Sequence, residues 1–276
     1  MTRVQLVTGF SGFVGRNLFT KLRTVFPDTE GLGDEYLIDK DWKNTLREIL
    51  DRIYPSTIYH VGACSNTLED NVQNMMVRNY ESTKVICDWG LLHDCKIIFS
   101  SSAANYGENG SYPSNLYGWS KYVAEDYVLK TGGVSLRYFN VYGPGEEQKG
   151  EMASFIYQAY LRDKNRTKIF LFPGKPQRDF VYISDVILAN MHASKIYHKL
   201  RGGYFEVSTG IASSYEKVME IMDLPYEYYK AELIPRGYQF YTCGDSSKWM
   251  SGWEPEYSLN QGIAEYKFYL KGMDKH

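Results

Sequence analysis

Short apolar runs alternate with longer amphipathic stretches along the first half of the chain. The apolar, β-prone runs occupy residues 4–7, 57–61, 96–99 and 134–137, and the helical patterns occupy 17–22, 41–53, 70–92 and 117–130. Strands that are apolar throughout are typical of a parallel sheet, because helices cover both faces of such a sheet. The pattern therefore predicts an α/β fold of the Rossmann type, with a doubly wound parallel sheet.

The second half of the chain carries shorter elements of mixed type. Helical patterns cover 151–162, 184–197, 214–222 and 259–270, and strand patterns cover 180–182 and 204–208. We expect residues 1–150 to form a dinucleotide-binding domain that is completed by strand and helix returns from about 178–210. Residues 151–276 would then form most of a small α/β substrate-binding lobe.

The pattern is weakest just after the first helix. Residues 26–33 are poor in β-formers, and Glu35–Asp39 is the only good strand candidate before the second helix. At the end of such a strand, Asp39 would hydrogen-bond the adenosine ribose of a dinucleotide. Alternatively, residues 37–39 belong to the third strand of the sheet, and the second strand is a stub near Val25.

The first strand runs directly into the segment TGFSGFVG at residues 8–15, in which a glycine recurs at every third position. A strand, a glycine turn and a helix in this order are the context of a dinucleotide-binding fingerprint. Gly9 permits a tight turn, Gly12 lets the backbone approach a pyrophosphate, and Gly15 allows close packing of the helix on the strand. The helix N-terminus would then face the negative charge of the phosphates.

Tyr117 and Lys121 lie four residues apart in a helical pattern, so they share one face of the helix. A lysine cation lowers the pKa of a nearby tyrosine, whose ordinary value is about 10. Such a tyrosine can take a proton from an alcohol while a nicotinamide cofactor takes a hydride. Ser102 follows the strand at 96–99, and its combination with the glycine turn favours catalysis over a serine-rich capping loop.

Composition argues against several classes of protein. The net charge of −2 is dispersed over both signs, which makes nucleic acid an unexpected partner. No apolar run reaches the length of a membrane span, and the N-terminus lacks the apolar core of a signal peptide. The four cysteines form no CxxC pair, so we expect reduced thiols in a cytoplasmic enzyme and no metal site.

Several longer segments resemble the extended short-chain dehydrogenase/reductase family of nucleotide-sugar enzymes. These segments are TGFSGFVG, HVGACS, SSAANYG, LYGWSK, LRYFNVYGP, QKGEMAS, LFPGKPQRDFVYISDV and RGYQFYT. The first segment and YxxxK are common to the superfamily, whereas GACS, QKGEMAS and RDFVY are more selective. Within the family the chain is most similar to the ADP-L-glycero-D-manno-heptose 6-epimerases, which implies isomerase chemistry in lipopolysaccharide biosynthesis in the cytoplasm.

The resemblance implies that one carbinol of a nucleotide-linked sugar is oxidised to a ketone and reduced again from the opposite face. It implies Tyr117 as the first acid/base and Lys149 as the second. Lys121 would hold the nicotinamide ribose and tune the tyrosine, and Ser102 would polarise the reacting oxygen. Judged by its neighbours in the sequence alone, Lys149 would instead be a surface lysine paired with glutamates.

NADP is the expected cofactor, with NAD as the alternative, and Arg16, Lys40 and Lys43 are cations that would serve a 2′-phosphate. Arg178 offers a planar fork to phosphate oxygens, unless it forms an internal ion pair with Asp179. The candidate cofactor-binding residues are Gly9, Phe10, Ser11, Gly12, Phe13, Val14, Gly15, Asp39, Val61, Gly62, Ala63, Cys64, Ser65, Asn79, Tyr117, Lys121, Val141 and Lys149. The candidate substrate-binding residues are Ser102, Asn140, Glu151, Gln158, Phe172, Pro173, Gly174, Lys175, Arg178 and Tyr238.

Other functions stay open. The protein would alternatively be a 4-epimerase or ketoreductase of another nucleotide sugar, or a non-catalytic dinucleotide-binding protein. A 4,6-dehydratase is disfavoured, because Ala103 and Ala104 stand where that class has an acidic pair. Besides the nucleotide sugar, the expected partner is a second copy of the chain, packed through the helices at 70–92 and 117–130.

Overall fold

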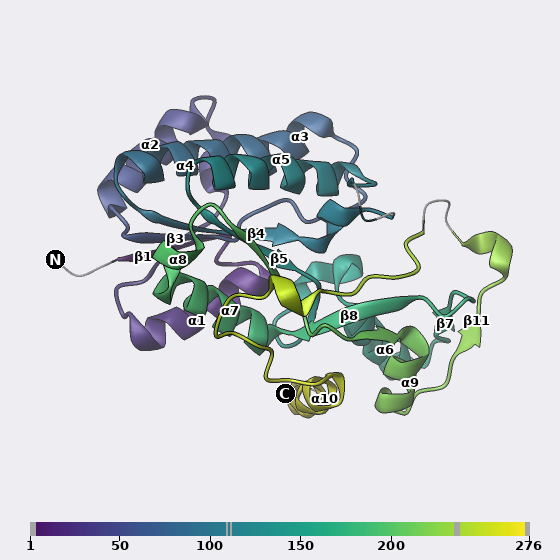
Figure 1. The fold of residues 1–276 in the computed structure, drawn as a ribbon. Coiled ribbons are helices and arrows are strands. Elements are labelled where there is room, and N and C mark those ends of the chain that lie inside the picture. The colour runs from purple at the N-terminus through teal and green to yellow at the C-terminus, as the bar shows by residue number, and fades with distance from the viewer. Residues whose placement is uncertain (1–3, 109, 111, 235–237, 274–276) are drawn as a thin grey trace. The chain divides into compact units, whose positions relative to one another are not determined.

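The computed structural model describes residues 4–108, 110, 112–234 and 238–273, and the chain divides into two compact units (Figure 1). The first unit comprises the chain up to Arg137 together with Ile187–Phe205. The second comprises Tyr138–Val186 and the chain from Glu206 onward. Arg236 and Gly237 of the RGYQFYT segment lie outside the described residues.

A six-stranded sheet, most of it in the first unit, has the strand order β2-β1-β3-β4-β5-β9. Its strands are β1 Gln5–Thr8, β2 Glu30–Leu32, β3 Thr57–His60, β4 Lys96–Ser102, β5 Val134–Tyr138 and β9 Tyr204–Val207. β1 pairs in parallel with both β2 and β3, and β3 pairs in parallel with β4. The strand order reverses between β1 and β3, and ligands of such sheets bind outside the carboxyl ends of the strands at this point.

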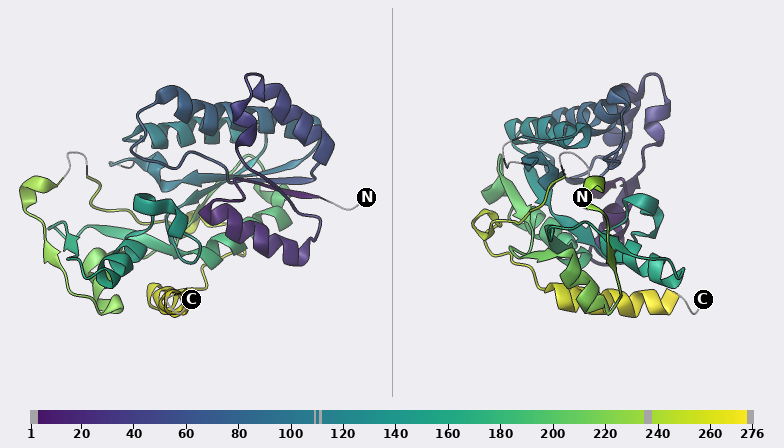
Figure 2. Two further views of the ribbon diagram at one scale, coloured as in Figure 1. Left: turned by 180° about the vertical axis from the view of Figure 1, so that it is seen from behind. Right: turned by 90° about the vertical axis from the view of Figure 1, so that its right-hand side faces the viewer.

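Helices cover both faces of this sheet. They are α1 Phe13–Val25, α2 Trp42–Ile53, α3 Val72–Met76, α4 Ser82–Leu92, α5 Leu116–Lys130, α7 Ile183–Lys195 and α8 Tyr197–Leu200. α2, α4 and α5 lie on one face, and α1 and most of α7 lie on the other (Figures 1 and 2). Under the first face, one buried cluster joins Leu6 and Phe99 of the strands to Leu46, Ile86 and Val128 of the helices. The predicted doubly wound, Rossmann-type fold is confirmed.

The strand predicted at Glu35–Asp39 is wrong. The second strand is β2, Glu30–Leu32, and residues Glu35–Ile38 form the short 3-10 helix η1. β2 is at the edge of the sheet, and Leu32 is its one buried residue. Because an edge strand this short needs little apolar surface, it has no clear pattern in the sequence. The apolar Ile38, which suggested a strand, is 87 % exposed.

The long helix predicted at 70–92 begins at Val72 and contains one turn of π-helix, η2 Val77–Glu81, between α3 and α4. Its inward side is buried at Asn79, Thr83 and Ile86, whereas Val72 at its start is 60 % exposed. Self-association through this helix and α5 stays a prediction.

The second unit is built around β8 Gln177–Tyr182. β6 Asn140–Tyr142 pairs with β8 in parallel and β10 Ala212–Ser214 pairs with it antiparallel. The other elements are β7 Phe170–Leu171, β11 Glu227–Tyr228, α6 Phe155–Lys164, α9 Tyr215–Met222, α10 Leu259–Met273 and the 3-10 segments η4 Glu147–Met152, η5 Ala231–Leu233 and η6 Ser246–Lys248. α6 starts four residues later than predicted, because the Ser154 hydroxyl caps it by accepting from the N–H of Tyr157.

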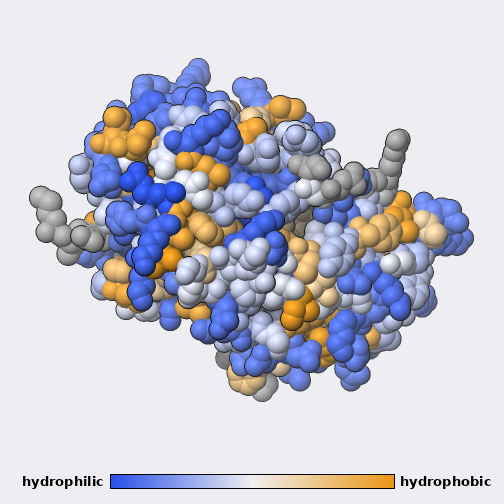
Figure 3. Space-filling model, viewed as in Figure 1, coloured by the Kyte–Doolittle hydropathy of each residue, from blue (hydrophilic) through white to orange (hydrophobic). Residues whose placement is uncertain are grey.

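On the face drawn in Figure 3, hydrophilic residues are mixed with small apolar groups. Within the described part of the chain, every helix is too short or too polar to cross a lipid bilayer.

Candidate active site

The glycine turn connects the carboxyl end of β1 to the N-terminus of α1. Gly9 has φ +63°, and a Cβ atom on it would lie 2.5 Å from the Cα of Gly62. A Cβ on Gly15 would overlap the carbonyl oxygen of Gly9. Ser11 and Gly12 are exposed at the start of the helix, and the N–H of Gly12 donates to the carbonyl of Gly9 over 3.0 Å, which closes the turn at a helix N-terminus suited to phosphate.

The second predicted cofactor segment, Val61–Ser65, follows β3 and lies directly beside the glycine turn. The N–H of Gly62 donates to the Thr8 hydroxyl over 3.0 Å, which fixes the two segments to each other. Both follow neighbouring parallel strands and meet at one edge of the sheet. The structure therefore brings together the predicted cofactor residues Gly9–Gly15 and Val61–Ser65.

Ser102 ends β4, and its hydroxyl accepts from the N–H of Ala104 over 3.1 Å. Tyr117 lies in the first turn of α5, where the Asn115 side chain caps the helix by accepting from the N–H of Gly118 over 2.8 Å. A Cβ on Gly118 would lie 2.8 Å from the carbonyl oxygen of Ala104. The glycine of LYGWSK thus lets the tyrosine helix approach the segment that follows Ser102.

Tyr117 is half-buried, and its pKa is raised above the ordinary value. Burial is the main cause; a hydrogen bond with Ser102 lowers this pKa, and the nearby Cys64 thiolate would raise it. The sequence predicted a lowered pKa from Lys121, so the direction differs. What the structure does provide is contact of Tyr117 with Ser102 and proximity to Cys64.

Lys121 is 2 % exposed, and its ammonium nitrogen lies 4.1 Å from the centre of the Phe99 ring. Burial lowers the pKa of Lys121 to about 7, against the opposing charge of Glu125 one turn further along α5. Glu125 is held by a buried ion pair with Arg137 and by the Ser135 hydroxyl at 2.7 Å. α5 is therefore tied to β5 through the same carboxylate that acts on Lys121.

Two predicted cofactor residues bond other groups of the protein. Asn79 is 1 % exposed, and its side-chain amide bonds both the N–H and the carbonyl of Cys64, at 2.7 and 3.0 Å. Asp39 lies before α2, where its carboxylate accepts from the N–H of Asp41 and the hydroxyl of Thr45. These bonds lower the pKa of Asp39. Neither side chain is at the end of β2.

The first acidic residue after β2 is Asp34, which is not among the cofactor residues predicted from the sequence. It forms an ion pair with Arg78 of the π-helical turn. The available signal was spacing, because Asp34 lies 19 residues after Gly15, close to the roughly 20 residues expected of a ribose-binding acid. The weak strand pattern before it obscured this signal.

In the second unit, Lys149 lies in η4 and is half-buried. Burial lowers its pKa, and the neighbouring charge of Glu146 raises it. Glu146 is fully buried and accepts from the N–H of Gly143 and the hydroxyl of Ser154, at 3.2 and 2.8 Å. Lys149 is therefore less solvated than the surface lysine that its sequence neighbours suggest.

Arg178 is buried on β8 between two aromatic rings, with its guanidinium carbon 5.8 Å from the Tyr215 ring centre and 5.4 Å from that of Tyr238. The Phe172 ring packs edge-on against Tyr238 at 5.0 Å. The predicted substrate residues Arg178, Tyr238 and Phe172 thus form one connected group.

The alternative in which Arg178 pairs with Asp179 is wrong. Successive residues of a strand point to opposite faces, and Asp179 accepts instead from Thr209, Gly210 and Gly244. The other predicted substrate residues are more dispersed. Asn140 and Glu151 are exposed, and the Gln158 side chain donates to the carbonyl of Gly150 over 2.7 Å.

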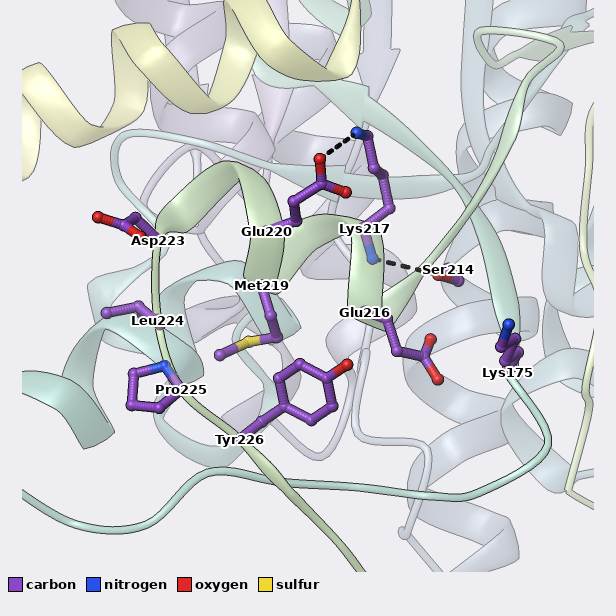
Figure 4. A pocket seen from close by; sticks show the side chains of 10 residues that line it. All are labelled: Lys175, Ser214, Glu216, Lys217, Met219, Glu220, Asp223, Leu224, Pro225 and Tyr226. Atoms are coloured by element: carbon purple, nitrogen blue, oxygen red, sulfur yellow. Dashed lines mark hydrogen bonds and ion pairs between the residues drawn. The ribbon is translucent and has the colours of Figure 1, made fainter.

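A pocket of about 780 Å³ opens in the second unit beside α9 (Figure 4). It is lined by Lys175, Ser214, Glu216, Lys217, Met219, Glu220, Asp223, Leu224, Pro225 and Tyr226. Lys217 and Glu220 form an ion pair of 2.9 Å along the helix. Lys175 is the one predicted substrate residue in this lining, so the pocket is distinct from the group around Arg178.

Comparison with known proteins identifies the family. Residues 5–206 match the model of the NAD dependent epimerase/dehydratase family. The chain belongs to this family. Family members named ADP-L-glycero-D-manno-heptose-6-epimerase are similar over nearly their whole length: that of Brachyspira hyodysenteriae is 31 % identical over 95 % of this chain and 96 % of its own. That of Pseudomonas aeruginosa is 30 % identical over 95 % and 97 %.

Solved structures of the family share the fold. The ADP-L-glycero-D-manno-heptose-6-epimerase of Helicobacter pylori superposes with a TM-score of 0.83 at 26 % identity, covering 98 % of this chain and 96 % of that one. The UDP-glucose 4-epimerase of Thermotoga maritima, solved with UDP-glucose, has a TM-score of 0.83 at 23 % identity, covering 98 % and 99 %.

Lys121→Met removes the buried amine and keeps an unbranched side chain. Because the pKa of Lys121 is lowered to about 7, the unfolded chain binds more protons than the folded one between about pH 7 and 10. The free-energy cost of burying the lysine falls as the pH rises over that range. The free energy of unfolding of the parent should therefore increase by up to about 1.4 kcal/mol per pH unit relative to that of the variant. Urea unfolding of nucleotide-free protein at about pH 6, 7.5 and 9 measures this gain.

Lys130→Met is the matched control, since Lys130 lies on the same helix with its side chain 71 % exposed and paired with Asp126. The hydrogen bond to Asp126 raises the pKa of Lys130, so Lys130 stays charged over this pH range. The difference in unfolding free energy between the parent and Lys130→Met should therefore not change with pH. Parallel stability curves for the parent and Lys121→Met would contradict a perturbed, buried amine.

Proposed function

We propose that the protein is an epimerase of a nucleotide-linked sugar, with ADP-L-glycero-D-manno-heptose 6-epimerisation as its activity. The observation that carries the proposal is the meeting of Ser102 and Tyr117 near Cys64 of the segment Val61–Ser65, with Lys121 one turn further along the same helix. The named relatives at 30 and 31 % identity over 95 % of the chain support the choice of sugar. The cytoplasmic location and the link to lipopolysaccharide biosynthesis stay predictions.

The residues at the sheet edge fit a nicotinamide dinucleotide. Gly9 and Gly15 leave room where side chains would clash, and the exposed start of α1 suits the pyrophosphate. We assign Val61–Ser65 and Lys121 to the nicotinamide side of the same ligand. When bound, the nicotinamide ring supplies a reversible acceptor for the hydride of the sugar carbon.

The chain's own residues handle the proton of the reacting hydroxyl. Tyr117 takes this proton as the carbinol becomes a ketone, and Ser102 donates a hydrogen bond to the reacting oxygen. Reduction from the opposite face needs a proton donor on that side, and we assign this role to Lys149. Burial lowers the pKa of Lys149, which brings an ammonium closer to the range in which it exchanges protons at neutral pH.

We assign the substrate's diphosphate to Arg178 and its aromatic neighbours Phe172 and Tyr238. A buried guanidinium stacked on rings keeps its planar fork of donors, which matches phosphate oxygens. Its hydrogen bonds to the carbonyls of Gln177 and Gln239 hold it in place. In the described part of the chain, Arg178 forms no ion pair with a carboxylate.

NAD is the cofactor we favour, although the sequence suggested NADP. The carboxylates of Asp34 and Glu35 follow β2, and an acid there accepts from the ribose 2′-hydroxyl and repels a 2′-phosphate. Two of the cations that would serve the phosphate have other partners: Arg16 donates to the carbonyl of Ser11, and Lys43 pairs with Glu81 at 2.8 Å.

Titration calorimetry of nucleotide-free protein should show tighter binding of NAD than of NADP. Asp34→Asn should narrow the ratio of the two dissociation constants about tenfold, because it removes one repelling charge. Asp28→Asn, an exposed acid before the other end of β2, should leave the ratio unchanged. A parent that prefers NADP would contradict the assignment.

Tyr117→Phe tests the proposed function directly. The parent is incubated with ADP-D-glycero-D-manno-heptose and a panel of UDP-sugars, and the configuration of each sugar is followed by NMR. We expect inversion of the heptose without net consumption of cofactor, and a rate lower by roughly 10²–10⁴-fold in the variant. Retained nucleotide binding shows that the variant is folded. Inversion by Tyr117→Phe at the parent rate would remove Tyr117 from the mechanism.

Lys149→Met tests the assignment of the second base. The variant should lose epimerisation and keep nucleotide binding, because it leaves unchanged the glycine turn and the segment Val61–Ser65, to which we assign the dinucleotide. An aldehyde analogue at the oxidation level of the ketone should still be reduced from the one face that Tyr117 serves. Epimerisation at the parent rate would instead identify Lys149 as a structural lysine beside Glu146.

A further inference from the structure

The π-helical turn η2 Val77–Glu81 interrupts a helix that is otherwise regular. Single π turns are rare and occur frequently at functional sites. The buried residue of this turn is Asn79, which is 1 % exposed although it carries a full amide. A buried amide is costly unless its donors and acceptor are bonded, so its partners indicate what the turn achieves.

Besides the Met75 sulfur, which its Nδ2 contacts at 3.0 Å on the preceding turn of helix, the side chain of Asn79 bonds two different parts of the candidate site. Its Oδ1 accepts from the N–H of Cys64 at 2.7 Å, and its Nδ2 donates to the carbonyl of Cys64 at 3.0 Å. The same Nδ2 donates to the hydroxyl of Ser120 at 2.8 Å. Ser120 in turn donates to the carbonyl of Tyr117 at 2.7 Å. One side chain therefore joins the cofactor segment Val61–Ser65 to the helical turn that carries Tyr117.

A second set of bonds connects this turn to β1 and β3. The Thr83 hydroxyl donates to the carbonyl of Asn79 at 2.7 Å, so it accepts from Nε2 of His60 at 2.9 Å. The other ring nitrogen, Nδ1, then accepts from the Thr8 hydroxyl at 2.7 Å, and Thr8 accepts from the N–H of Gly62. Burial lowers the pKa of His60 to about 3, so the imidazole is neutral and every hydrogen bond has a fixed direction.

We propose that Asn79, acting through Ser120, is a positioning residue that holds the Tyr117 turn of α5 in register with the cofactor segment Val61–Ser65. It contacts neither reacting group. Because Asn79 bonds both the segment after β3 and Ser120, the position of that segment fixes the position of the Tyr117 turn. Nucleotide binding at the segment should therefore also order the first turn of α5. The expected effect of Asn79 on the rate of epimerisation rests on the proposed function. Its expected effect on the ordering of the first turn of α5 rests on the hydrogen bonds alone.

The main variant is Ser120→Ala, which removes one hydroxyl, and with it the bond from Asn79 and the bond to Tyr117. Ser82→Ala is the matched control: Ser82 lies on α4, is as buried as Ser120 and donates to the carbonyl of Arg78 at 2.6 Å, without contact to Cys64 or Ser120. Asn79→Asp is the second variant; it keeps the acceptor of Asn79 and, when ionised, loses the donations to Cys64 and Ser120.

The first readout is kinetic. Ser120→Ala should lower kcat about 10- to 100-fold with KM for the sugar changed less than about threefold, because a displacement of about 1 Å costs on this scale. Ser82→Ala should keep the parent kcat. Asn79→Asp should regain activity as the pH falls, because the protonated acid donates one hydrogen bond again. Parent kcat in Ser120→Ala, or an equal loss in Ser82→Ala, would overturn the proposal.

The second readout does not depend on the reaction. Amide hydrogen exchange is measured for residues 116–121 with and without NAD. Binding should slow exchange there in the parent and in Ser82→Ala, and this protection should be lost in Ser120→Ala. If the parent inverts no sugar while this pattern holds, the proposed function fails and the coupling stands. Protection that is unchanged in Ser120→Ala overturns the coupling itself, whatever the sugar assay shows.

Discussion

The close approach of backbone segments at the carboxyl edge of the parallel sheet is the constraint on which the first unit depends. Gly9 and Gly62 are so close that a Cβ on Gly9 would lie 2.5 Å from the Cα of Gly62, and Gly15 meets the carbonyl of Gly9. Any side chain there would push α1 away from β1 or β1 away from β3. Because the contact is backbone to backbone, the hydroxyl of Thr8 can also bond the N–H of Gly62 and lock the edge.

Behind that edge, the unit buries several polar side chains, each of which contacts a hydrogen-bond partner or an aromatic ring. Lys121, His60 and Asn79 are each at most 2 % exposed, and an unbonded polar group in such a place would cost about 1–3 kcal/mol. The ring of Phe99 faces the lysine, and two threonine hydroxyls hold the histidine. Such networks rigidify a site when they are complete, which is the condition that proton transfer between fixed groups requires.

The second unit places two cationic side chains, Arg178 and Lys149, in partly or fully buried surroundings. Arg178 is held by backbone carbonyls and aromatic faces, so its charge is not neutralised by a neighbouring carboxylate in the described part of the chain. Lys149 lies beside Glu146, whose own carboxylate is occupied by backbone and hydroxyl donors. The two cations thus differ in kind: one suits the permanent charge of phosphate, and the other suits proton exchange.

The sequence by itself determined the parallel sheet, the glycine turn and the shared helical face of Tyr117 and Lys121, because these depend on local periodicity and on backbone that tolerates no side chain. The predicted strand at 35–39 failed because β2 is an edge strand with one buried residue, which leaves no apolar pattern. Only the tertiary structure decided the low pKa of Lys121, the π turn at Asn79 and the separation of Arg178 from Asp179. Each of these follows from burial and from partners distant in the chain, and neither burial nor a distant partner is encoded in the spacing of nearby residues.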